Sequence, residues 1–64
     1  MAWVAVDKNG TENIFQFHPR RSNNSFTPLY SYSMFLTLPR GSIKKLTGRD
    51  LTWNDEPIEL KEND

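Results

Sequence analysis

The sequence predicts a mainly β fold of the α+β class, with one small antiparallel sheet of four or five strands and a short helix at residues 42–47 before the last strands. Short runs in which polar and apolar residues alternate lie between turns rich in Gly, Pro and Asn, a pattern typical of half-buried strands. The 64 residues are enough for a single domain. Eight aromatic residues can supply most of its small core.

The first two predicted strands form a β-hairpin. Residues 2–6 are apolar, residues 7–10 form a tight turn, and residues 11–17 return as the second strand. Gly10 suits the positive-φ position that a bulged hairpin turn requires. Residues 18–28 follow as a polar loop, because turn-forming residues dominate this segment. We interpret it either as a simple connection or as a binding loop.

Residues 29–38 form the third predicted strand, because apolar and polar side chains alternate there with a period of two. Phe35 interrupts the otherwise polar face, so we expect its ring to pack under a loop or against a partner. The predicted buried face comprises Tyr30, Tyr32, Met34, Leu36 and Leu38.

Residues 42–47 form the predicted helix, which is too short to be stable alone. Ser42 is the expected N-cap and Gly48 the expected residue after its C-terminus. Ile43 and Leu46 are three residues apart, so both are expected to face the core.

The last strands are predicted at residues 50–53 and at residues 58–60. Pro57 has no N–H to donate, so the final strand suits the edge of a sheet. Residues 61–64 form a polar tail that is expected to fray. A helical turn before a final strand also fits an SH3-like barrel, an analogy that concerns architecture alone.

The charges balance overall but not along the chain. Eight basic and eight acidic residues give a formal net charge of zero, which excludes a uniformly basic nucleic-acid binder and a uniformly acidic nucleic-acid mimic. Residues 1–49 hold seven basic and two acidic residues, a net charge of +5, and residues 50–64 hold one basic and six acidic residues, a net charge of −5. The sequence is therefore dipolar.

No constellation of residues suggests catalysis, and we expect no enzyme activity, no metal site, no cofactor and no small-molecule substrate. Cysteine is absent and His18 is the single histidine, so thiolate chemistry is excluded and no ligand set for a metal accompanies the histidine. The three glycines are scattered and form no phosphate loop. We also expect a cytoplasmic protein with no membrane contact, because no signal peptide or run of about 20 apolar residues occurs.

The leading functional hypothesis is a small non-catalytic interaction module that binds a protein partner or a second copy of itself. An exposed edge strand can pair with another chain by β-addition, and small domains are often stabilised by association. The candidate contacts lie in the 18–28 loop, on the polar face of the third strand and on the last strand. They are Arg20, Arg21, Phe26, Phe35, Ile58 and Leu60.

A second hypothesis is nucleic-acid binding. Basic side chains near aromatic rings can contact phosphates while bases stack on the rings. The candidate nucleic-acid contacts are Arg20, Arg21, Arg40, Lys44, Lys45 and Arg49.

Two segments carry a resemblance: WVAVD at residues 3–7 with Gly10, Glu12, Ile14 and Phe15, and LPRGSIKKL at residues 38–46 with the GR, LTW and DEPIEL groups after it. They resemble a set of short uncharacterised bacterial and phage-associated proteins. The resemblance implies a small, mainly β domain encoded by mobile elements or their hosts, and it implies no activity. From it follows a third hypothesis, a phage-encoded inhibitor of a host enzyme.

Overall fold

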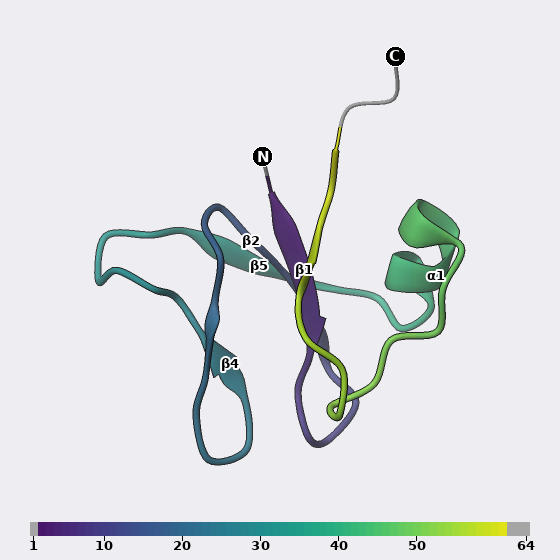
Figure 1. Cartoon of the computed structure of the whole chain (residues 1–64), viewed down its shortest axis with the longest axis horizontal. Coiled ribbons are helices and arrows are strands. Elements are labelled where there is room, and N and C mark those ends of the chain that lie inside the picture. Colours follow the sequence, from purple (N-terminus) through teal and green to yellow (C-terminus); the bar gives the residue numbers. More distant parts are fainter. Residues whose placement is uncertain (1, 62–64) are drawn as a thin grey trace.

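The computed structural model describes residues 2–61, which form six short strands and one helix (Figure 1). The mainly β, antiparallel fold expected from the sequence is therefore confirmed, and most of the expected tail at 61–64 lies outside the described residues. The elements are β1 (Trp3–Val6), β2 (Glu12–Phe15), β3 (Arg20–Arg21), β4 (Phe26–Thr27), β5 (Phe35–Leu38), α1 (Ser42–Thr47) and β6 (Ile58–Glu59).

Four strands make the main sheet, in the order β5-β2-β1-β6, and every neighbouring pair is antiparallel. In the register of this sheet, Val4 pairs with Ile14 on one side and with Ile58 on the other. Strands β3 and β4 form a separate small hairpin. The main sheet ends in two edges, β5 and β6, so residues 2–61 form no closed SH3-like barrel.

The predicted first hairpin is confirmed. The N–H of Asp7 donates to the carbonyl of Thr11 at 2.8 Å, and the N–H of Gly10 donates to the carbonyl of Asp7 at 2.9 Å. Gly10 has a φ of 90°, a conformation that residues with a Cβ rarely adopt. Local turn chemistry therefore places β1 beside β2.

The central strand β1 is buried on both faces, which explains its continuous apolar sequence. On one face Val4 and Val6 pack with Ile43 of α1. On the other face Ala5 packs with Phe15 and Phe26. Figure 1 shows the consequence: α1 and the β3–β4 hairpin lie on opposite sides of the sheet.

The predicted strand over residues 29–38 is wrong in length and in its buried face. Strand β5 begins only at Phe35, because the chain turns before it, where the N–H of Ser33 donates to the carbonyl of Tyr30 at 3.0 Å. Met34 is 71% exposed and Leu36 is 67% exposed. Leu36 and Leu38 do lie on one face of β5. That face stays exposed at Leu36, because α1 packs on β1 and not on β5.

The helix α1 spans the predicted residues, but its N-terminus is not capped by Ser42. Gly41 is the N-cap residue, and because glycine has no side chain, the N-cap residue itself makes no capping hydrogen bond. Instead the carboxylate of Glu12 accepts the N–H of Gly41 at 2.7 Å and the N–H of Ile43 at 2.8 Å. Gly48 ends the helix with a φ of 76°, as predicted. Leu46 is exposed rather than in the core.

Two other predicted segments differ from the structure. Residues 50–53 form no strand, because the carboxylate of Asp55 accepts the N–H of Thr52 at 2.8 Å and closes a turn there. The polar 18–28 loop folds into the β3–β4 hairpin, closed by a hydrogen bond from the N–H of Ser22 to the carbonyl of Ser25 at 2.7 Å. The short edge strand after Pro57 is confirmed as β6.

Candidate functional site

The outer edge of β5 pairs with no other strand among the described residues. The N–H of Gln16 donates to the carbonyl of Met34 at 3.0 Å, so Met34 belongs to a hydrogen-bonded pair. In an antiparallel ladder such pairs alternate with non-hydrogen-bonded ones. Phe35 and Thr37 therefore direct their N–H and C=O groups away from β2. This edge presents unpaired backbone donors and acceptors to its surroundings.

Apolar side chains line the same edge. Met34 and Leu36 are exposed beside Ile14 and Ala2, and together they line a shallow groove of about 170 Å³. On the opposite face of the strand, Phe35 is half exposed and stacks on Phe15, with ring centroids 5.3 Å apart. The edge of β5 thus combines unpaired backbone groups with an apolar surface on both faces.

The other edge of the sheet is better protected. Strand β6 has only two residues, and the buried Pro57 precedes it. Short edge strands, prolines and charges are the features by which proteins prevent unwanted strand pairing. Ile58 and Leu60 were expected to contact a partner, but both are half-buried and pack on the cluster of Val4, Val6 and Ile43.

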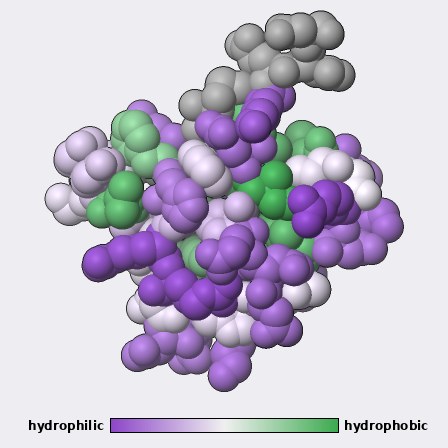
Figure 2. All heavy atoms as spheres, in the orientation of Figure 1, coloured by the Kyte–Doolittle hydropathy of each residue, from purple (hydrophilic) through white to green (hydrophobic). Residues whose placement is uncertain are grey.

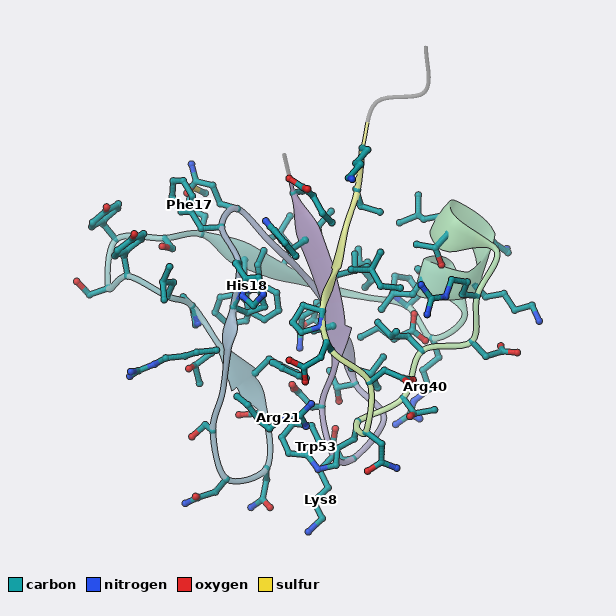
Figure 3. The ribbon with its side chains drawn as sticks, viewed as in Figure 1. Lys8, Phe17, His18, Arg21, Arg40 and Trp53 are labelled. Carbon is teal, nitrogen blue, oxygen red and sulfur yellow. The ribbon has the colours of Figure 1, made fainter. Side chains whose placement is uncertain are left out.

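Phe26 and Arg21, expected as partner contacts in the 18–28 segment, are engaged within the molecule. Phe26 is only 5% exposed and packs with Ala5 and Phe15, so its ring offers little surface to a partner. The Arg21 guanidinium lies 4.7 Å from the ring centroid of Phe26 and 4.4 Å from that of Trp53. Figure 3 shows Arg21 beside Trp53.

The Arg21 guanidinium also links the β3–β4 hairpin to the turn at residues 53–56 by hydrogen bonds and an ion pair. It donates to the carbonyl of Trp53 at 2.6 Å and to the carbonyl of Asp55 at 3.2 Å, and it pairs with the Glu56 carboxylate at 3.1 Å. Arg21 therefore has a structural role that its position in a polar segment did not indicate.

Four of the basic residues proposed for nucleic-acid contact lie on elements on opposite sides of the main sheet. Arg20 and Arg21 are on β3, whereas Lys44 and Lys45 are on α1, which Figure 1 places on the opposite side of the sheet. The Lys44 ammonium pairs with the Asp50 carboxylate at 3.1 Å. Arg40 donates to the carbonyl of Asn9 at 3.1 Å, and Arg49 follows α1 and is exposed. The ion pairs of Arg21 and Lys44 join the basic and acidic parts of the chain.

An exposed aromatic cluster was missed because Tyr30 and Tyr32 were assigned to the buried face of a strand. Tyr30 and Tyr32 stack with ring centroids 5.2 Å apart, and Phe17 meets Tyr30 edge-on at 5.6 Å. Phe17 lies beyond the end of β2 (Figure 3), and Figure 2 shows hydrophobic atoms at this end of the molecule. The turn-forming serines between the tyrosines were the signal that the chain bends there.

Two ionisable side chains, His18 and Asp55, make well-defined contacts. His18 packs against Trp3, with ring centroids 4.3 Å apart, and its Nδ1 lies 2.6 Å from the carbonyl oxygen of Pro19. Hydrogen bonds from the N–H and then the hydroxyl of Thr52 hold the pKa of Asp55 below its ordinary value. Within residues 2–61, no three His, Cys, Asp or Glu side chains gather where they could hold a metal ion.

Comparisons of the chain with protein families, curated proteins and solved structures found no match. In the part of the chain that the structure describes, no helix has the length and apolar character needed to cross a membrane.

Proposed function

We propose that the protein is a non-catalytic interaction module that binds an extended segment of a protein, or a second copy of itself, along the free edge of β5. The observation that carries the proposal is the unpaired backbone of Phe35 and Thr37 beside an exposed apolar groove. Backbone hydrogen bonds supply affinity in β-addition, and pockets for alternate side chains supply specificity. Both features occur together on β5.

The contrast between the two edges supports this proposal. Strand β6 carries a proline before it and the acidic Glu59 within it, whereas β5 has four residues and no charge. Proteins usually shield an edge strand of the second kind. An uncharged, apolar and accessible edge is therefore best explained as a surface that another strand covers.

Nucleic-acid binding is less well supported by the placement of the basic residues. A phosphate backbone is contacted by several cations along one surface. Arg20 and Lys45 instead lie on elements at opposite sides of the sheet, and Arg21 and Lys44 already pair with carboxylates. We therefore place the interaction surface on β5 and not on the basic residues.

Selection from a displayed library of short random peptides tests the proposal. We expect the protein to enrich peptides in which apolar residues alternate, because such peptides can pair with β5 and place every second side chain in the groove. In NMR hydrogen exchange, a bound peptide should slow exchange of the Phe35 and Thr37 amides, since these N–H groups gain partners.

The matched variants are Leu36→Lys and Leu46→Lys. Both residues are exposed leucines, but Leu36 lies on β5 and Leu46 on α1. Leu36→Lys should abolish peptide binding, and Leu46→Lys should preserve it. The proposal fails if the amides of Phe35 and Thr37 stay unprotected with every peptide and at every protein concentration, or if Leu36→Lys binds as the wild type does.

A further inference from the structure

We infer that the strand covering β5 is β5 of a second copy of this chain, joined antiparallel about a two-fold axis at Leu36. This inference rests on the proposed function and names its occupant. The pairing would join two four-stranded sheets into one continuous sheet. The edge of β5 is complementary to itself in hydrogen bonding, in side-chain shape and in charge.

The hydrogen bonds select the register. With Leu36 opposite Leu36 of the second copy, each Phe35 lies opposite a Thr37, and both residues have backbone groups that point outward. Each such pair then exchanges both of its backbone hydrogen bonds. Every outward-facing group of β5 found in the structure gains a partner in this arrangement.

The neighbouring symmetric registers are poorer. A shift in one direction places Phe35 opposite Pro39, which has no N–H to donate. A shift in the other direction places Thr37 opposite Ser33, whose N–H already donates to the carbonyl of Tyr30 at 3.0 Å. The register centred on Leu36 avoids both problems.

The side chains fit the same register. Leu36 meets its own copy in a non-hydrogen-bonded pair, where side chains approach most closely. Met34 of one copy lies opposite Leu38 of the other, so the two apolar grooves form a continuous surface. Residues 34–38 carry no charge and the whole chain has a net charge of zero, so neither β5 itself nor the net charge of the chain opposes association.

The chain has enough surface for an interface of ordinary size. A standard interface buries about 800 Å² per partner, roughly a sixth of the 4618 Å² accessible surface of this chain. The exposed Met34, Leu36 and half-exposed Phe35 lie at the centre of the proposed interface, and the exposed aromatic cluster that includes Tyr32 adjoins it.

A charge-swap experiment tests the inference, with molar mass measured by light scattering across a dilution series. We expect the wild type to reach twice the 7.5 kDa chain mass. Leu36→Lys and Leu36→Glu should each be monomeric, with dissociation constants raised about a hundredfold or more because a buried leucine is lost from each copy. An equimolar mixture of the two variants should restore the dimer, because opposite charges then face each other at the two-fold axis.

Controls and contrary results are well defined. The control variants Leu46→Lys and Leu46→Glu, on α1, should remain dimeric. Because Leu36 is exposed, the Leu36 variants should fold, and circular dichroism checks that they do. The inference is overturned if the wild type stays monomeric up to millimolar concentration, if either Leu36 variant dimerises alone, or if the mixture stays monomeric. A monomeric wild type whose Phe35 and Thr37 amides are protected by a library peptide would overturn the second-copy inference and leave the proposed function standing.

Discussion

Replacing Arg21 with alanine should destabilise the protein more than any other single change in its basic residues. The substitution removes the hydrogen bonds to the carbonyls of Trp53 and Asp55, the stacking on Phe26 and Trp53, and the ion pair with Glu56. Because these contacts join the β3–β4 hairpin to the turn at 53–56, their loss separates two segments that are far apart in the sequence.

The magnitude follows from the contacts and their exposure. Hydrogen bonds from a charged donor contribute about 1.5–3 kcal/mol, and the 35% exposure of the Arg21 side chain favours the lower end of that range. Stacking of the partly exposed guanidinium on the rings of Phe26 and Trp53 adds about 0.5–1 kcal/mol. Glu56 is 82% exposed, so its ion pair adds at most about 1 kcal/mol. We expect Arg21→Ala to lower the free energy of unfolding by about 2–3 kcal/mol.

Thermal and urea unfolding followed by circular dichroism measure this effect. At about 4–8 °C per kcal/mol for a domain of this size, the melting temperature should fall by roughly 10–20 °C. Arg20→Ala is the matched control, because Arg20 is the exposed neighbour on the same strand, and it should change stability by less than about 0.5 kcal/mol. Equal effects of the two substitutions would refute the structural role given to Arg21.

Three further changes have defined outcomes. Glu12→Ala should cost about 1–2 kcal/mol in urea unfolding, because its carboxylate caps α1 through Gly41 and Ile43; an unchanged midpoint would contradict that capping. Gly48→Ala should cost about 1–2 kcal/mol, since the φ of 76° disfavours a Cβ, and Gly48→Asn should cost less. Asp55 has a lowered pKa in the folded state, so its stabilising effect is present above the ordinary carboxyl pKa and is lost as pH falls through the lowered value. Asp55→Asn should therefore flatten the acid limb of the stability–pH curve, and an identical acid limb would count against the Thr52–Asp55 hydrogen bonds.

The sequence predicted the elements that local chemistry determines. The first hairpin depends on a turn that ends at Gly10, and the end of α1 depends on Gly48, so short-range patterns were sufficient for both. The capping of α1 was missed because Glu12 reaches it from β2. A contact between residues so far apart in the sequence leaves no periodic signal in either segment.

The candidate site shows the limit of alternation as a signal. Alternating residues around Leu36 predicted one apolar face of a strand, which is right for β5. Alternation does not reveal whether another layer covers that face, because the covering depends on where α1 packs. Phe26 was expected on the surface for a different reason, because it lies in a segment of polar, turn-forming residues, although it packs against Trp53 at a ring-centroid distance of 5.3 Å.

The position of β1 at the centre of the sheet has a consequence for synthesis on the ribosome. Among the described strands, β1 is made before both of its neighbours, β2 follows it closely in the sequence, and β6 follows much later. During translation one edge of β1 therefore remains open until residues 58–59 emerge. A nascent chain in that state exposes an apolar strand that can aggregate, so β6, which follows the turn that Arg21 holds, protects this edge of β1 when it pairs.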